Sequence, residues 1–262
     1  MFKVVNLIKS YFSFNLKATM EYRSAFISQL FAVFINNGTF LIFWYLILNR
    51  VGGNINGVYF NDIVMMWAIV ATSFGFSEVF FGNSPRISSI IYKGELDVYI
   101  LQPKPVLINL ISSRMSVLGW GDIFYGFVIF FINFGLDYKK IILFIIFSIT
   151  GTLVFTAFRV LIHSLTFFIG NNESLSTTLE NIMITLGVYP SSIFRGPIML
   201  LFYTIFPVFF MVYLPINLLN EFSIYKIIIL LLGDFVFMVI AFSVFYFGLK
   251  KYESGNLIGS RM

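Results

Sequence analysis

The chain contains no cysteine and a single histidine, His163. The lack of cysteine excludes a disulfide framework and thiolate chemistry. A lone histidine with no HExxH motif and no paired carboxylates gives no support to a catalytic metal centre, and in a helix it is more often a hydrogen-bonded packing residue. The sequence also lacks a GxxxxGK[ST] phosphate loop. We therefore expect this chain to bind no metal, no nucleotide and no other cofactor of its own.

Charged residues are also scarce in this chain. Charged residues make up 11% of the 262 positions, whereas hydrophobic residues make up 59% and the mean hydropathy is +0.91. Soluble domains contain roughly 25% charged residues, so this chain could not cover the surface of a water-soluble fold. Its apolar residues form long continuous runs. They predict an all-α integral membrane protein with one domain over residues 1–262.

Five apolar segments reach the roughly 20 residues that a helix needs to cross the hydrocarbon layer. They cover residues 24–48, 60–81, 112–134, 141–169 and 224–249. With one further crossing between residues 173 and 220, the chain is predicted to have six transmembrane helices.

The region 173–220 is irregular because it contains four of the seven prolines. In one interpretation a span ends near Tyr189, and residues 190–220 form re-entrant helices on the outer side. In the other, residues 173–189 are interfacial and residues 197–219 form the span. Broken helices at membrane depth survive only where protein or a cavity surrounds them.

The N-terminal segment, residues 1–23, is amphipathic. Val5, Ile8, Phe12 and Leu16 recur at spacings of three and four, and the lysines occupy other positions. This pattern predicts an interfacial helix in contact with membrane lipids. The alternative is a poorly ordered basic tail.

The basic residues predict an orientation. Ten Lys and Arg residues lie in the N-terminal segment, in the loop between the second and third spans and in the C-terminal tail, whereas five lie in the loops of the opposite side. The positive-inside rule then places both termini and that loop in the cytoplasm. Because the net charge of +5 is spread between spans, we expect no nucleic-acid partner. The excess of Ile, Phe, Asn and Lys is typical of AT-rich bacterial genomes, so we expect a bacterial plasma membrane.

Charged residues inside the predicted spans are candidates for function, because a charge at membrane depth is costly. They are Arg114, Asp122, Arg159 and Asp234, with Glu78 nearer an inner helix end. Arg114 is close enough to the start of its helix to reach the headgroups. The depth of Asp122 and Arg159 suggests an ion pair between neighbouring helices, and we weigh such structural pairing ahead of contact with a substrate.

One compact polar block interrupts the apolar sequence. Residues 91–105 read IYKGELDVYILQPKP. Gly94 permits a turn, and Pro103 and Pro105 end a helix before the third span. The block keeps an apolar surface, made of Leu96, Val98, Tyr99 and Ile100. That surface fits either a short helix lying on lipid or a helix that docks in a groove of a soluble partner.

These residues resemble a known family. The stretch KGELDVYILQPKPVLINLISSRMSVLGWGDIFYG, residues 93–126, is similar to the signature of the six-span permeases of type 2 ABC transporters: G-x-L-D-x-Y/L-L-x-x-P, then S-R, then G-D-x-x-x-G. The matching positions are Gly94, Leu96, Asp97, Tyr99, Leu101, Pro103, Ser113, Arg114, Gly121, Asp122 and Gly126. The strings EYR, YPSSIF, FPVFFMVYLP and YESG also fit, so the resemblance covers nearly the whole chain. Phe194 stands where the family usually has a tyrosine, which puts a role for that hydroxyl in doubt.

The resemblance implies a membrane dimer of two permease chains, alike or different, above two copies of a cytoplasmic ABC ATPase that binds ATP and Mg²⁺. Residues 84–105 would form the coupling helix, resting in a groove of that ATPase. The implied coupling residues are Tyr92, Gly94, Glu95, Leu96, Asp97, Tyr99 and Pro103. The chain itself would be no enzyme, but the permease of an exporter for a small molecule, a peptide or a lipid-like substrate.

Two other classes remain open. An ion-gradient-driven secondary transporter could use Asp122 and Asp234, although the inverted repeats of such proteins are not visible. A membrane enzyme would need a cluster of His, Asp or Glu side chains, and the single His163 argues against one. A membrane scaffold has no sequence feature that would distinguish it.

Overall fold

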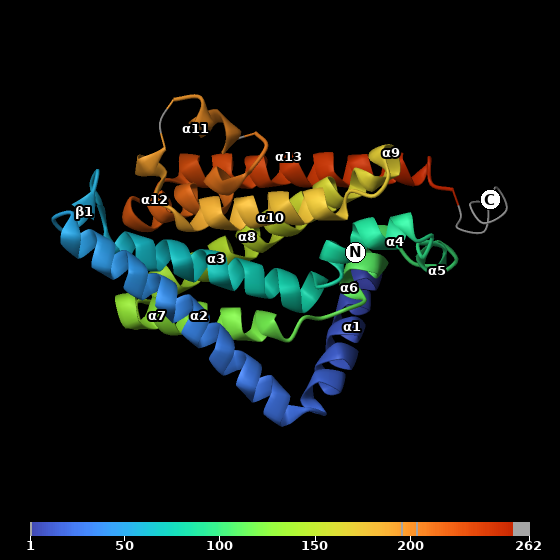
Figure 1. The fold of residues 1–262 in the computed structure, drawn as a ribbon, viewed down its shortest axis with the longest axis horizontal. Helices are drawn as coiled ribbons and strands as arrows, with labels where there is room; N and C mark the ends of the chain where they lie inside the picture. The colour runs from blue at the N-terminus through green and yellow to red at the C-terminus, as the bar shows by residue number, and fades with distance from the viewer. Residues whose placement is uncertain (1, 195, 203, 254–262) are drawn as a thin grey trace.

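The computed structural model describes residues 2–194, 196–202 and 204–253, which fold into a bundle of helices (Figure 1). Arg195 and Arg261, counted above for orientation, and Ser254 and Gly255 of the YESG string lie outside the described residues. The first half of the chain contains α1 (Phe2–Met20), α2 (Arg23–Arg50), β1 (Asn54–Ile55), β2 (Val58–Tyr59), α3 (Phe60–Phe81), η1 (Ser84–Arg86), α4 (Ile87–Tyr92), α5 (Asp97–Ile100), α6 (Val106–Ser112) and α7 (Leu118–Phe134). The second half contains α8 (Tyr138–Ser164), α9 (Thr166–Ile169), α10 (Glu173–Val188), η2 (Ser191–Ile193), α11 (Ile198–Leu201), η3 (Phe209–Tyr213), α12 (Leu214–Asn220) and α13 (Ile224–Leu249).

Within the described residues, four helical stretches are long and apolar enough to cross a membrane: α2, α3, α8 continued by α9, and α13. They correspond to four of the five predicted apolar segments, which confirms a helical membrane protein. α7 and α10 are shorter and run beside α3 and α8 (Figure 1). The 16 residues of α10 extend about 24 Å, less than the roughly 30 Å of a hydrocarbon core.

The helices run between two ends of the molecule. At the left of Figure 1, β1 and β2 form a hairpin, and its turn holds Asn56 and Gly57 at φ values of 51° and 86°. Asn-Gly is the pair that this kind of turn favours, because both positions need a positive φ. At the right lie α4, α5 and α6, together with the end of α13. We call these the hairpin end and the polar-turn end, and residues 84–105 the polar turn.

α3 forms the centre of the bundle. In its apolar window 78% of the residues are buried, against 17% for α2 and 22% for α13. Glycines bring α7 close to α3: a methyl group on Gly126 would lie 2.0 Å from Oγ1 of Thr72, and one on Gly75 would lie 2.6 Å from the carbonyl oxygen of Gly119. Small residues are what closely packed membrane helices require. α2 and α13 instead present most of their surface outward, toward lipid or another chain.

The predicted third span is interrupted. α6 ends at Ser112 and α7 begins only at Leu118, so one continuous helix over residues 112–134 is wrong. Residues at the end of α3 and just beyond it form hydrogen bonds with backbone groups of this stretch. The amide of Ser116 donates to the carbonyl oxygen of Glu78 at 2.9 Å, and the Asn83 side-chain amide donates to the carbonyl oxygen of Leu110 at 3.0 Å. These tertiary hydrogen bonds replace helical ones.

The irregular region divides into several short elements, and both a span ending near Tyr189 and re-entry of residues 190–220 from the outer side stay predictions. α10 runs from the polar-turn end to the hairpin end, and the short elements η2, α11, η3 and α12 follow (Figure 1). The hydroxyl of Ser192 donates to the carbonyl oxygen of Ile55 at 3.2 Å, which ties this region to the hairpin. Met211 and Val212 are fully buried, and Tyr213 donates to the carbonyl oxygen of Leu186 at the last turn of α10. One continuous span over residues 197–219 does not fit these short helices.

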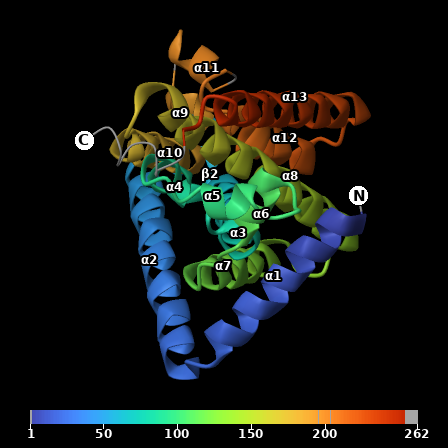
Figure 2. The ribbon, with the colours of Figure 1, turned by 90° about the vertical axis from the view of Figure 1, so that its right-hand side faces the viewer.

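The N-terminal segment forms the helix α1, which lies across the polar-turn end (Figure 2). The rings of Phe12 and Phe80 stack at 5.1 Å between centroids, and Leu16 packs against the same apolar cluster. The side chains of Lys3, Lys9 and Lys17 are exposed. The helix is therefore confirmed, whereas its contact with lipid headgroups stays a prediction.

Candidate functional site

The polar turn is shaped by Gly94. This residue has a φ of 74°, a conformation that side chains with a Cβ rarely adopt. The amide of Glu95 donates to the carbonyl oxygen of Ile90 at 2.9 Å, and the amide of Gly94 donates to that of Ile91 at 3.1 Å. These two bonds form a Schellman motif, which ends α4 and redirects the chain into α5. The predicted turn at Gly94 is confirmed.

Two of the residues predicted to face a partner are turned inward instead. Leu96 is fully buried in the main hydrophobic core, so its place in an exposed apolar surface was a wrong prediction. Tyr99 is partly buried, and its hydroxyl lies 3.2 Å from that of Ser113 and 3.4 Å from the side-chain nitrogen of Asn83. The reason is local geometry, because a short helix that folds back onto the bundle must bury one of its faces. Leu96 and Tyr99 anchor the polar turn.

The opposite face of the polar turn is exposed and partly apolar. The exposed fractions are 56% for Tyr92, 61% for Val98 and 84% for Leu101. Glu95, Ile100 and Pro103 are exposed as well, and Asp97 is half-buried. We call Tyr92, Val98, Ile100 and Leu101 the outer apolar face. Such a face on a short rigid segment matches the helix-in-groove type of recognition.

Both ends of the described chain brace the polar turn. The hydroxyl of Tyr11 on α1 donates to Oδ1 of Asn109 at 2.7 Å, and the ammonium of Lys104 lies 5.3 Å from the centre of the Tyr11 ring. Tyr252, just beyond α13, packs against the core cluster that contains Leu96. Burial, with the nearby charge of Asp97 adding to it, raises the pKa of Tyr252 to about 12.

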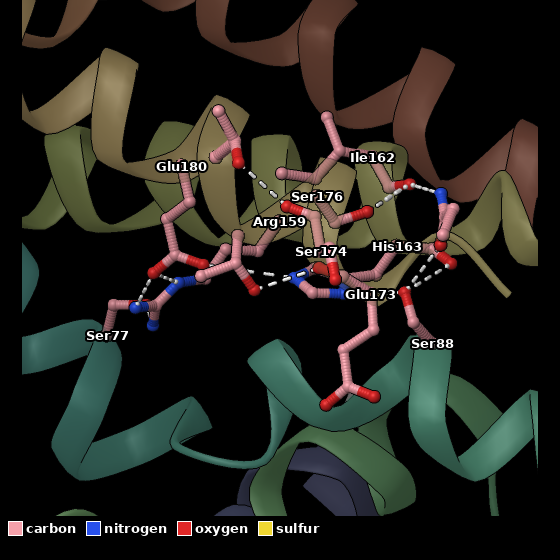
Figure 3. Close-up of polar contacts among 12 residues, drawn as sticks. Ser77, Ser88, Arg159, Ile162, His163, Glu173, Ser174, Ser176 and Glu180 are labelled. Atoms are coloured by element: carbon pink, nitrogen blue, oxygen red, sulfur yellow. Dashed lines mark hydrogen bonds and ion pairs between the residues drawn. The ribbon is translucent and has the colours of Figure 1, made fainter.

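A buried charge cluster lies in the bundle behind the polar turn (Figure 3). Its centre is Arg159 of α8, which is 1% exposed. Nη2 of Arg159 lies 2.7 Å from Oε1 of Glu78 on α3, and Nε donates to Oε1 of Glu180 on α10 at 2.8 Å. Nη2 also pairs with that oxygen of Glu180. We call Glu78, Arg159 and Glu180 the charge cluster. It joins three helices through one guanidinium, whose planar fork can serve two carboxylates at once.

Aromatic rings complete the surroundings of Arg159. Its guanidinium carbon lies 4.5 Å from the centre of the Phe155 ring and 5.2 Å from that of Phe74. The faces of both rings attract a cation. Two carboxylates and two rings therefore offset the desolvation of this one charge.

A series of polar contacts connects the charge cluster to the polar turn. Oγ of Ser88, on α4, lies 2.7 Å from Nδ1 of His163 and donates to Oδ1 of Asn172 at 2.8 Å. Nε2 of His163 lies 3.8 Å from Oε2 of Glu180. Figure 3 shows Ser88, His163 and Glu180 in this order along the interior. The prediction that His163 is a hydrogen-bonded packing residue is confirmed.

The predicted ion pair between Asp122 and Arg159 is wrong. Arg159 is occupied by Glu78 and Glu180, whereas Oδ1 of Asp122 accepts a hydrogen bond of 2.8 Å from Nδ2 of Asn37 on α2. Depth alone could not distinguish these partners, because the rotation of each helix decides which neighbour its side chains face. Arg114 is exposed, as its predicted reach toward the headgroups requires.

Asp234 of α13 stands apart from these groups. It is 4% exposed, and neither of its carboxyl oxygens has a hydrogen-bond partner within the described part of the chain. A buried polar group without a partner is costly. Among the described residues no group of three His, Cys, Asp or Glu side chains is arranged to hold a metal ion.

Comparison with protein families decides the class of this molecule. The model of the ABC-2 family transporter proteins matches residues 34–256, which includes the polar turn and the whole charge cluster. The chain belongs to the ABC-2 family. No curated protein and no solved structure matches the chain.

An ABC-2 protein is the membrane permease of an ABC transporter, and this family associates with an ABC ATPase. The ABC-2 assignment and the four long apolar helices together make this chain a multi-pass membrane component of a transporter. α1 precedes the residues that the family model matches, although it packs against the polar turn.

Glu180 is not among the candidate residues predicted from the sequence. The residue lies in the middle of α10, and Leu179, Met183 and Ile184 beside it all belong to the packed interior. Apolar residues at spacings of three and four around an acid were the available signal. Ser88 and Asn172 gave no such signal, because single polar residues near helix ends are common.

Proposed function

We propose that this ABC-2 permease is the membrane-spanning subunit of an ATP-driven exporter in a bacterial plasma membrane. Two permease chains, identical or different, form the membrane part, and ATP and Mg²⁺ bind to a cytoplasmic ATPase dimer below it. The polar turn and both termini face the cytoplasm, and six helices cross the membrane. Residues 190–220 re-enter from the outer side.

The outer apolar face is the observation that carries this proposal. Val98 and Leu101 are exposed on a segment that Leu96 and Tyr99 anchor to the bundle, so a force on that face reaches the membrane helices. The chain has no recognisable phosphate loop of its own, so transport needs either an external ATPase or an ion gradient. Ser88 then connects the same segment to His163 and the charge cluster.

A pair of matched substitutions tests the docking. Leu101 and Leu136 are 84% and 85% exposed, but Leu136 lies in the α7–α8 turn at the hairpin end. We expect Leu101→Asp to abolish co-purification of the permease with its ATPase and Leu136→Asp to leave it intact. If both variants retain the ATPase, the polar turn is not the docking segment.

Labelling of an introduced cysteine tests the orientation. Because the natural chain has no cysteine, only the introduced thiol can react. In Tyr92→Cys and Leu136→Cys the introduced residue is the only thiol of the chain. A membrane-impermeant maleimide should label Leu136→Cys on intact cells and Tyr92→Cys only after permeabilisation. Labelling of Tyr92→Cys on intact cells would place the polar turn outside and end the proposal.

One observation favours a second function, an ion-gradient-driven transporter. The carboxyl group of Asp234 is buried without a partner in the described structure, as a proton-carrying group would be. Transport that a protonophore abolishes and ATP depletion leaves unchanged would establish this alternative. Transport with the opposite response supports the ATP-driven exporter.

A further inference from the structure

A cavity of about 290 Å³ opens among α2, α3, α7 and α10. Asp122, Asn36 and Asn37 contribute polar groups, and the apolar walls include Trp67, Val70, Phe74 and Ile184. Trp67 and Phe74 belong to the middle turns of α3, so the cavity lies within the membrane part and not at either end. We propose that this cavity binds the cargo and that the cargo is a small amphipathic organic cation. The inference deepens the proposed transport function and rests on it.

Asp122 supplies the charge. Its one hydrogen bond to a side chain in the described structure comes from the amide of Asn37, which offers a dipole but no positive charge. A carboxylate at this depth favours a cation nearby. Arg159 cannot serve, because Glu78 and Glu180 hold it from two sides. No basic side chain of the described residues forms an ion pair with Asp122, so this position is open to a cation from outside the chain.

The charge balance of the interior points in the same direction. Away from the helix ends, the described helices of the bundle carry four carboxyl groups, those of Glu78, Asp122, Glu180 and Asp234, and the single guanidinium of Arg159. An interior with this excess of acids attracts cations and repels anions. It disfavours an anionic lipid or a sugar phosphate as cargo.

The walls indicate an organic cation rather than a metal ion. Hard metal ions need six or more oxygen ligands, whereas the cavity offers one carboxylate and a few amides. Trp67 and Phe74 provide aromatic surface, which binds alkylammonium groups and apolar bodies alike. The Trp67 ring is held by Phe40, which stacks on it at 4.3 Å between centroids. A glycan would require many more hydrogen-bond donors and acceptors than these walls carry.

The volume limits the size of the cargo. It is close to the lower end of the range for small-molecule sites, roughly 300 to 1,000 Å³. The cavity therefore accepts one aromatic or short aliphatic body with one ammonium group. A folded peptide does not fit.

Binding of aryl-alkyl-trimethylammonium ions with short, medium and long spacers tests the proposal. Each ion has a neutral isostere in which carbon replaces nitrogen. Equilibrium dialysis is carried out on the purified permease, with and without its ATPase, in wild-type, Asp122→Asn, Asp122→Glu and Asp234→Asn forms. Size-exclusion profiles show which variants fold.

We expect at least one ion to bind the wild type, and its neutral isostere to bind much more weakly. Asp122→Asn should lower the affinity roughly ten- to hundredfold, because it removes a charge-assisted contact. Asp122→Glu should retain binding, and Asp234→Asn should match the wild type since its carboxyl group lies outside the cavity. Trp67→Leu should weaken binding less than Asp122→Asn does.

Three results would overturn the inference: no ion of the series binds, the neutral isosteres bind equally well, or folded Asp122→Asn binds like the wild type. In the last case Asp122 only joins α7 to α2 through Asn37. These outcomes are separate from a failure of the transport proposal. A permease that binds the ions but never associates with an ATPase would refute the exporter and leave the cation site standing.

Discussion

Oγ of Ser88 lies 2.7 Å from Nδ1 of His163, so the polar turn and α8 meet through a buried hydrogen bond. His163 in turn lies beside Glu180, which binds Arg159. These contacts offer a direct route by which a displacement of α4 would act on α8 and α10. Four predictions follow from the contacts around this connection and from the buried groups near it.

Ser88→Ala should uncouple ATP hydrolysis from transport. The variant removes the bonds to His163 and Asn172 but leaves the outer apolar face unchanged, so ATPase binding and ATP hydrolysis should persist. The loss of these two buried hydrogen bonds costs about 2 kcal/mol, which corresponds to roughly a thirtyfold fall in transport per ATP hydrolysed. Transport into proteoliposomes and phosphate release, measured together, give this ratio. Ser89→Ala is the matched control, and an equal fall in both variants would contradict the prediction.

Arg159→Met should destabilise the fold severely. It leaves Glu78 and Glu180 buried beside each other without their cation, and breaking a buried charge pair costs about 3 to 5 kcal/mol. Denaturant titration of the purified protein in detergent, followed by tryptophan fluorescence, measures the loss. Arg114→Met removes an exposed arginine and should change the free energy of unfolding little. Comparable stability of the two variants would show that the charge cluster does not hold the helices.

Leu96→Asp and Val98→Asp should fail in different ways. Leu96 is fully buried, so a carboxylate there destabilises the permease itself and lowers its yield in the membrane. Val98 is 61% exposed, so Val98→Asp should fold normally but lose its ATPase. Fluorescence-detected size exclusion reports folding, and co-purification reports docking. A well-folded Leu96→Asp protein would mean that this residue is not anchored in the core as the structure shows it.

Asp234→Ala should be at least as stable as Asp234→Asn. Both remove the carboxylate, but asparagine leaves a buried amide where the structure provides no partner, a cost of about 1 to 3 kcal/mol. Thermal unfolding of the two purified variants in the same detergent makes the comparison. If Asp234→Asn is clearly the more stable variant, a hydrogen-bond partner must reach this position, for example from a second chain.

Much of the architecture could be predicted from the sequence because it depends on local properties. Long apolar runs predict membrane helices wherever they occur, and four of the five predicted segments are continuous stretches of this kind. Gly94 predicts a turn because few other residues accept its backbone angles. The third span failed because its backbone hydrogen bonds go to the end of α3, a partner about thirty residues away in the chain.

The candidate site was predictable only in part. The exposed side of the polar turn was found, since polar residues between apolar spans are conspicuous. Leu96 was assigned to the wrong side, because four residues of helix carry too little periodicity to tell the buried face from the exposed one. Glu180 was missed because no local pattern links it to Arg159, which precedes it by 21 residues.

By itself, the order of apolar and polar residues determined that this is a helical membrane protein with no recognisable phosphate loop. These properties follow from the cost of exposing apolar surface to water and from the residue types that nucleotide chemistry needs. Only the tertiary structure decided that Arg159 binds Glu78 and Glu180, while Asp122 faces Asn37 and a cavity. The physical reason is that such pairings depend on the rotation and relative height of packed helices, and the spacing of residues along any one helix contains neither.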